Sequence, residues 1–330
     1  ILGFVGGIIV GLIGFFISKY MLQWMDTPSE VLPLSTLYLQ IFFCGMPFNL
    51  LYNFGASILR ACGDTKRPLL ILSLAGVINI LLNLLLVAVF KMSVAGVALA
   101  TTVSQLISAV LVVFCLMKRR GFGRLYLKKL RINGNALKEI LIIGVPAGVQ
   151  STIFSLSNTI IQSSINGFGA DAMAGNGAAA NIEGFVYVAM NAFAQACLTI
   201  VGQNYGAGKI ENINLVILQC ALLSTGFGLI LGVGVYLGSY GLLYLYNTNP
   251  VVIAYGQERM KIIATTYFLC GVMEVLAGGL RGIGRSITPM ITSIIGVCGV
   301  RILWIYTIFA IDKNPTMLYA SYIVSWAFTV

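Results

Sequence analysis

Four ionisable residues lie inside long apolar stretches of the sequence. They are Lys19, Glu183, Glu274 and Arg301. A charged side chain in hydrocarbon is costly, so each of these residues is a candidate for function. A carboxylate in such surroundings can hold a proton while water is excluded and release it when a cation or water arrives. Because Lys19 lies near the end of its stretch, where a lysine can reach the membrane surface, the two carboxylates are the stronger candidates for ion exchange.

Glu183 is the carboxylate that we expect to couple ion movement to transport. It lies about 16 Å along a helix expected to begin near residue 172, close to the middle of the hydrocarbon. No residue nearby in the sequence neutralises it, and Tyr187, Asn191 and Gln195 continue its helix face at steps of four residues. Such a polar stripe is expected to line a cavity. The alternative is structural, because Asn and Gln side chains often bind neighbouring helices.

Other polar residues could complete this site. In the preceding apolar stretch, Gln150, Asn158 and Gln162 are spaced to share one helix face, and we expect them to line a cavity for substrate. Glu274 is the second candidate carboxylate. Arg301 could neutralise Glu274, in which case the pair would be structural.

Several kinds of chemistry are excluded by the residues that are missing. The 330 residues contain no histidine, so they cannot form a Ser-His-Asp triad. The seven cysteines lie in or beside apolar stretches without CxxC spacing, which argues against a zinc site or a disulfide framework. No phosphate-binding GxxxxGK(S/T) loop occurs. We therefore expect no enzyme and no cofactor or metal centre, apart from a proton or sodium ion as coupling ion.

The composition predicts that helices in a membrane position these residues. Hydrophobic residues make up 58% of the chain and charged residues 9%, and the mean hydropathy is +0.95. Such values lie far outside the range of soluble domains. Nearly all of ten apolar stretches reach the roughly 20 residues that a helix needs to cross a membrane, and the alternation typical of membrane strands is absent. The stretches, which predict an all-α polytopic membrane protein, are residues 1–25, 34–59, 68–90, 94–117, 140–165, 172–201, 215–237, 260–279, 287–311 and 317–330.

The net charge of +10 follows the predicted membrane topology. In a ten-helix threading, fourteen of the 20 Lys and Arg residues fall in connections on one side, eight of them within residues 118–138. Arg259 and Lys261 fall in a connection on the opposite side. Cytoplasmic loops are enriched in Lys and Arg, so we assign the basic side to the cytoplasm and expect contact with lipid but none with nucleic acid.

A repeated motif reveals the internal organisation. The pattern Leu-Arg-x-x-Gly-x-(Thr/Ser)-x-x-Pro occurs twice, 221 residues apart. In each copy the Gly can end one helix and the Pro can lie in the first turn of the next. Both copies have the same predicted orientation, which indicates two parallel repeats. We expect the two arginines at the cytoplasmic surface, where they would anchor the chain and help to close an inner gate. The motif residues are Arg60, Gly63, Pro68, Arg281, Gly284 and Pro289.

A further motif, GQNYGAGK at residues 202–209, lies two helices before the second copy. Its counterpart in the first half would precede Ile1. We therefore interpret the chain as truncated at both ends and lacking two initial helices of a six-plus-six arrangement. Residues 1–117 would form an N-lobe with helices 3 to 6, residues 118–138 a basic cytoplasmic linker, and residues 139–330 a C-lobe with helices 7 to 12, the last incomplete.

The segments LRACGDTKRPLL, GVPAGVQ, GQNYGAGK and LRGIGRS together resemble the multidrug and toxic compound extrusion (MATE) family, and the resemblance covers essentially the whole chain. It implies a two-lobed, twelve-helix antiporter that exports cationic amphipathic compounds in exchange for protons or sodium ions. We expect a monomeric, multi-pass protein of a bacterial inner membrane, with cationic small molecules as its substrates.

The resemblance also bears on the ion site. Similar proteins often have Asn followed four residues later by Asp in the third helix of this chain, working with an aspartate on the first helix of the family fold. Here the two positions are Asn79 and Asn83, and we keep both as ion-coupling candidates with Glu183 and Glu274. Glu274 lies about one turn from the position where several relatives have their acid.

Two rival functions share some of these features. A flippase for lipid-linked oligosaccharides, from the same superfamily, would have the same two-lobed design. Its anionic pyrophosphate substrate would favour several intramembrane Arg or Lys residues, whereas the sequence indicates only Arg301 well inside. A membrane-embedded enzyme would need clustered nucleophiles, bases or metal ligands, which the predicted helices do not show.

Overall fold

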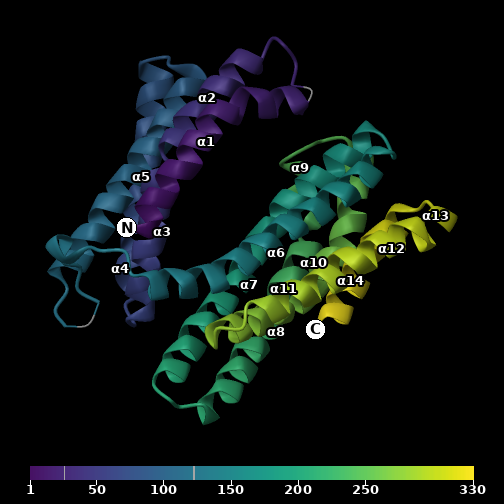
Figure 1. Ribbon diagram of the computed structural model, residues 1–330. Coiled ribbons are helices and arrows are strands. Elements are labelled where there is room, and N and C mark those ends of the chain that lie inside the picture. Colours follow the sequence, from purple (N-terminus) through teal and green to yellow (C-terminus); the bar gives the residue numbers. More distant parts are fainter. Residues whose placement is uncertain (26, 122) are drawn as a thin grey trace. The chain divides into compact units, whose positions relative to one another are not determined.

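The computed structural model describes residues 1–25, 27–121 and 123–330, so Phe122 of the predicted linker lies outside the described residues. The chain divides into two compact units, Ile1–Gly134 and Asn135–Val330. We call them the N-terminal unit and the C-terminal unit. Figure 1 colours the first from purple to blue and the second from teal to yellow.

The N-terminal unit is a bundle of membrane-length helices. Its α1 packs against α2 and α3, and α5 packs against α2, α3 and α4. A π-helical turn, η1, continues α4. The elements are α1 (Leu2–Trp24), α2 (Leu32–Cys44), α3 (Met46–Ala61), α4 (Lys66–Asn83), η1 (Leu84–Val89), α5 (Ser93–Lys118) and the short 3₁₀ turn η2 (Leu127–Lys129).

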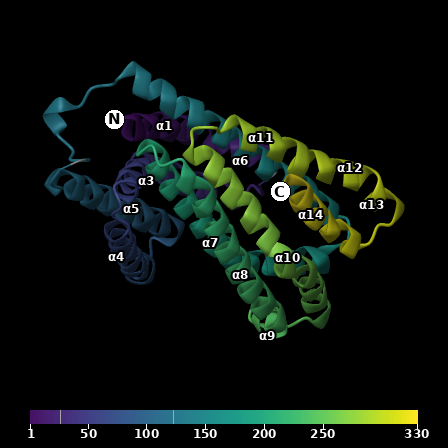
Figure 2. The ribbon, with the colours of Figure 1, turned by 90° about the horizontal axis from the view of Figure 1, so that it is seen from below.

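The C-terminal unit is built around α10, which contacts α7, α8 and α14 (Figure 2). Its largest core cluster joins apolar side chains of α6, α10 and α14. The elements are α6 (Gly134–Asn166), α7 (Ala170–Gly206), α8 (Glu211–Leu237), α9 (Ser239–Tyr244), α10 (Pro250–Gly282), α11 (Ile287–Ser293), the π-helical turn η3 (Ile294–Gly299), α12 (Val300–Tyr306), α13 (Ile308–Ile311) and α14 (Pro315–Thr329).

The predicted all-α membrane fold is confirmed. Every regular element of the described chain is helical, and eight helices are long and apolar enough to cross a membrane. The pair α2 and α3, bent by 42°, passes the same test as one span. The final helix, α14, has 15 residues and is shorter than a full span. Helices suit this solvent because they satisfy their own backbone hydrogen bonds in lipid.

One helix begins much earlier than its apolar run predicted. The expected start of α10 was residue 260, but the helix begins at Pro250. The side chain of Asn249 caps it by accepting a hydrogen bond from the Val251 N–H at 3.0 Å. The assignment of Arg259 and Lys261 to an external connection is therefore wrong. Arg259 lies inside the helix and is only 7% exposed.

The repeated motif forms the same turn twice, as predicted. Gly63 and Gly284 have φ values of +81° and +82°, in the left-handed region. In both copies the Gly N–H donates to the carbonyl three residues back at 2.9 Å, and the next N–H donates to the carbonyl five residues back, also at 2.9 Å. These two bonds define a Schellman C-cap. Pro68 and Pro289 then lie in the first turns of α4 and α11.

Small residues hold α7 and α10 close together. A Cβ added to Gly278 of α10 would lie 2.7 Å from the carbonyl oxygen of Ala194 on α7. One added to Gly282 would lie 2.8 Å from the side chain of Val201. Close backbone approach at small residues is a main source of helix association in membranes. This contact fixes two of the helices that supply the site described below.

We predict that Gly284→Ala lowers the stability of the protein by about 1 kcal/mol, because an L side chain disfavours the left-handed conformation. No atom lies within 4 Å of the added Cβ, so the backbone conformation alone is tested. Gly226→Ala in α8 is the matched control, since its added Cβ also meets open space and alanine favours a helix. Thermal unfolding in detergent measures both. Equal melting temperatures for the two variants would contradict this account of the motif.

Candidate functional site

The C-terminal unit contains a cavity of about 460 Å³ between side chains of α6, α7, α10, α12 and α14. This volume lies within the range of small-molecule sites, roughly 300–1,000 Å³. Five aromatic side chains line it: Phe154, Tyr187, Tyr267, Tyr322 and Trp326. Polar and charged side chains complete the lining. The cavity can therefore receive an amphipathic molecule.

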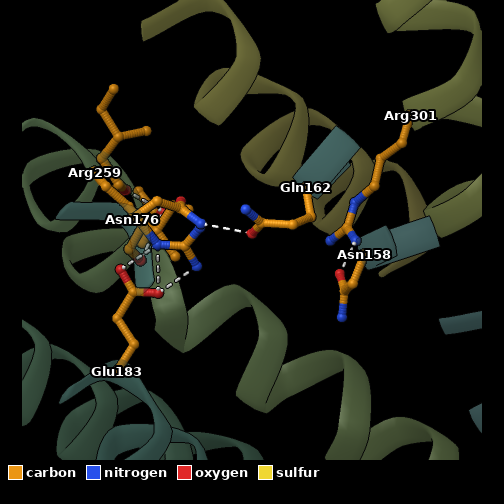
Figure 3. A network of polar contacts seen from close by, with 9 residues as sticks. Asn158, Gln162, Asn176, Glu183, Arg259 and Arg301 are labelled. Atoms are coloured by element: carbon orange, nitrogen blue, oxygen red, sulfur yellow. Dashed lines mark hydrogen bonds and ion pairs between the residues drawn. The ribbon is translucent and has the colours of Figure 1, made fainter. Parts of the chain in front are cut away.

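The cavity brings together most of the polar residues that the sequence placed in a substrate site. Those that line it are Gln150, Asn158, Tyr187, Asn191 and Gln195, together with Glu274. Two predicted residues, Gln162 and Glu183, are not part of its lining. They belong to a separate polar network in the same unit (Figure 3).

Glu183 forms a buried ion pair with Arg259. The two side chains are 2% and 9% exposed, and Arg259 Nη2 lies 2.7 Å from Glu183 Oε2. Arg259 Nε also donates to the two carboxylate oxygens, at 3.2 and 3.1 Å. Glu183 is therefore neutralised by a residue 76 positions away on α10, which its sequence neighbours did not indicate.

The ion pair continues into a chain of amides. Arg259 Nη1 donates to Asn176 Oδ1 at 2.7 Å, and Asn176 Nδ2 donates to Gln162 Oε1 at 2.8 Å. The guanidinium carbon also lies 5.8 and 5.7 Å from the ring centres of Tyr319 and Tyr322 on α14. Arg259 therefore connects α10 with α7 and α14 and, through Asn176, with α6. This geometry favours the structural alternative for Glu183.

Glu274 has different surroundings. It lines the cavity, and within the described residues its carboxylate forms no ion pair and no hydrogen bond. Its oxygens are thus available to a proton, a sodium ion or a cationic group entering the cavity. No cluster of three or more His, Cys, Asp or Glu residues that could hold a metal occurs in the described part of the chain. Asn191 and Gln195 line the same cavity as Glu274.

Arg281 is half-buried in the last turn of α10 and lines the cavity, and its predicted position at the cytoplasmic surface stays a prediction. Its Nη2 donates to Gln150 Oε1 at 2.5 Å, and Gln150 Nε2 donates to Ser293 Oγ on α11 at 2.8 Å. Its Nε is buried without a hydrogen bond. The other motif arginine, Arg60, donates to Ser57 Oγ at 3.3 Å within its own helix. The two copies share a backbone turn but use their arginines differently.

Arg301 is the most deeply buried charged residue of the cavity, with 1% exposure. Its Nε donates to Ser325 Oγ at 3.0 Å. Its Nη1 donates to Asn158 Oδ1 at 3.1 Å (Figure 3). The guanidinium carbon lies 4.1 Å from the ring centre of Tyr322. No ion pair joins Arg301 to Glu274 in the described chain. The suggestion that these two residues neutralise each other is therefore not supported.

The asparagines of the N-terminal unit bind each other and α5. Asn79 Nδ2 donates to Ser104 Oγ at 3.3 Å, and Asn83 Nδ2 donates to Asn79 Oδ1 at 3.1 Å. Asn83 Oδ1 is buried without a hydrogen bond. Asn79 and Asn83 are therefore close enough to act together, and their role in ion coupling stays a prediction.

The sequence analysis placed Arg259 outside the membrane segments, and it therefore predicted too few arginines inside them. Arg259, Arg281 and Arg301 all lie within helices of the C-terminal unit. The dipeptide Asn249-Pro250 was the available signal, because Asn followed by Pro is typical of a helix start. Starting the helix there places Arg259 inside it.

Comparison with known proteins shows the family. The MatE family model matches residues 1–85 and 146–307. The chain is 30% identical over 285 residues to the probable multidrug resistance protein YpnP of Bacillus subtilis, which covers 86% of this chain and 64% of YpnP. It is 27% identical over 283 residues to the FAD transporter of Shewanella oneidensis, covering 82% of this chain and 60% of that protein. The chain thus spans less than two thirds of the length of these relatives.

A solved structure agrees with the fold. The Vibrio cholerae MATE transporter VcmN, in its bent form, superposes with a TM-score of 0.89 and 18% identity, covering 99% of this chain and 74% of that one. The cavity, the helical membrane fold and the family match are consistent with one another. The chain belongs to the MATE family of membrane transporters.

Proposed function

We propose that the protein exports amphipathic, drug-like compounds that carry a cationic centre, in exchange for protons or sodium ions. The observation that carries this proposal is Glu274, a carboxylate in the wall of a cavity that no described side chain holds in an ion pair or hydrogen bond. A cationic cargo and a coupling ion would compete for this carboxylate. Mutually exclusive occupancy gives exchange without hydrolysis of a nucleotide.

The cavity lining supports a cargo with an aromatic or otherwise apolar body. Tyr187, Tyr267 and Trp326 offer flat apolar surfaces, and Asn191 and Gln195 offer donors and acceptors at the wall. Aromatic faces also attract cations. Such a lining accepts varied shapes, because it depends on few directional contacts.

The names of the relatives support transport of small molecules but do not fix the charge of the cargo. YpnP is named a probable multidrug resistance protein, and the Shewanella oneidensis relative is named an FAD transporter. Export of varied compounds is the function that we carry over to this chain. The charge of its cargo has to be argued from the cavity.

The proposal includes a membrane topology. Residues 118–138 would lie in the cytoplasm as a basic connection between two lobes, and the protein would act as a monomer in a bacterial inner membrane. The motif turns at Gly63 and Gly284 would then face the cytoplasm. The distribution of Lys and Arg supports this orientation.

We predict that Glu274→Gln abolishes gradient-driven efflux while changing stability by less than about 0.5 kcal/mol, because the carboxylate loses no hydrogen bond and no ion pair with a described residue. Efflux of ethidium from cells expressing the protein, with pH and sodium gradients imposed separately, measures this and identifies the coupling ion. The matched control is Glu139→Gln, which removes an exposed carboxylate of α6 outside the cavity. Efflux by Glu274→Gln with unchanged dependence on both gradients would remove Glu274 from the mechanism.

The ion pair of Glu183 and Arg259 generates a second prediction. Glu183→Gln or Arg259→Gln alone should destabilise the protein by about 3–5 kcal/mol, because each leaves a buried charge without its partner. The double variant should recover most of that loss, which a double-mutant cycle of unfolding measures. If Glu183→Gln instead kept full stability and lost gradient-driven efflux, Glu183 would be the coupling carboxylate after all.

A further inference from the structure

Two buried arginines in the C-terminal unit differ in how their charge is balanced. Arg259 has the carboxylate of Glu183 at 2.7 Å. Arg301 is buried more completely, at 1% exposure, and forms no ion pair with any described residue. A guanidinium is always charged in proteins, so it cannot escape this cost by losing its proton. The absence of a built-in counterion at Arg301 therefore needs a physical reason.

The hydrogen bonds of Arg301 use only part of its guanidinium, and the remaining end faces the cavity. Nε and Nη1 are used by Ser325 and Asn158, whereas Nη2 donates to no described residue. The ring of Tyr322 packs against the guanidinium at 4.1 Å and fixes its plane. Because Arg301 is itself part of the cavity lining, this held and partly unbonded guanidinium faces the space that receives cargo.

We infer that Arg301 binds an oxyanion of the cargo, either a carboxylate or a phosphate group. This inference rests on the proposed function, since it assigns a chemical class to what the same cavity carries. A guanidinium binds such groups through strong charge-assisted hydrogen bonds, and an arginine that is already oriented loses little freedom on binding. The cargo then supplies the negative charge that the protein does not.

The charges of the cavity place this oxyanion at one end. Its charged lining residues are Glu274, Arg281 and Arg301, with a surplus of one positive charge. Arg281 lies next to the turn between α10 and α11, and by helical rise Glu274 is about 10 Å and Arg301 about 20 Å from that turn. An oxyanion at Arg301 and a cationic centre at Glu274 can therefore be accommodated in one molecule. The cargo class is an amphipathic molecule that carries an oxyanion in addition to the cationic centre of the proposed function.

A purely structural role is the alternative. Arg301 joins α12 to α6 through Asn158 and to α14 through Ser325. A neutral amide could make similar bonds without the cost of a buried charge. The structural role predicts that binding is indifferent to an oxyanion on the cargo, and this difference is measurable.

The test uses two pairs of fluorescent probes that differ only in an oxyanion. Tetramethylrhodamine and its methyl ester differ in a carboxylate, and riboflavin 5′-phosphate and riboflavin differ in a phosphate. Binding is measured by fluorescence polarisation with the purified protein in lipid nanodiscs, with empty nanodiscs subtracted. In at least one pair, we expect the member that carries the oxyanion to bind about 10-fold or more tightly than its partner. The pair that shows the preference identifies carboxylate or phosphate.

Variants then assign the preference to Arg301. Arg301→Gln should remove this preference. The affinity for the member that carries the oxyanion should fall about 10-fold, and the affinity for the other member should change less than about 3-fold. Arg301→Lys should keep part of it, because the charge remains. Arg285→Gln is the matched control, as it removes the same charge from an exposed residue outside the cavity, and the preference should persist.

Three results would overturn the inference. The first is a wild-type protein that binds both members of each pair equally or favours the uncharged group, which needs no variant and leaves the proposed export of drug-like compounds standing. The second is an undiminished preference in folded Arg301→Gln. The third is saturable binding of none of the four probes, which ends the inference, whereas the proposed function is decided separately by the efflux of ethidium.

Discussion

A charge inside a membrane protein must be neutralised by the protein or be available for function. This constraint governs how the buried charges of the C-terminal unit are arranged. Arg259 and Glu183 meet it inside the protein, with three hydrogen bonds between them and a further bond to Asn176. Glu274 and Arg301 form no ion pair with any described residue, and both line the cavity. The unit therefore separates a closed, charge-balanced network from an open pair of opposite charges. In the proposed function, the first serves stability and the second serves exchange.

The helices that build this separation are held by local features of the chain. Close contact at Gly278 keeps α7 against α10, so that Glu183 can reach Arg259 while Tyr187, one turn later, reaches the cavity. On the other wall, the π-helical turn η3 ends at Gly299, two residues before Arg301. A π turn shifts the register of the residues that follow it and is frequent at functional sites. The helix that carries Arg301, α12, begins directly after this turn.

Apolar runs of about 20 residues were enough to predict the membrane helices, because hydrocarbon imposes length and composition on any helix that crosses it. The motif turns were predictable for a similar reason, since a left-handed C-cap nearly requires glycine at Gly63 and Gly284. Polar residues at helical spacing also indicated the cavity wall. Each of these features depends on residues that lie close together in the sequence.

Pairing across helices was not predictable in the same way. Glu183 and Arg259 are 76 residues apart, and one sequence gives no register between two helices. The apolar run also began after Arg259, so the predicted span did not include that residue. Nor could the sequence distinguish the aromatic residues of the cavity, such as Tyr322, from those of the core, because both classes have the same composition and spacing. Packing between helices decides these contacts.

The central claim is that Glu274, and not Glu183, is the carboxylate at which the coupling ion and the cargo compete. A hydrophobic carbodiimide reacts with protonated carboxyl groups in membranes, and peptide mass spectrometry locates the adduct. The account predicts modification of Glu274, reduced when a cationic cargo is present, and no modification of Glu183, whose carboxylate is held by Arg259. Modification of Glu183 with Glu274 left untouched would contradict it.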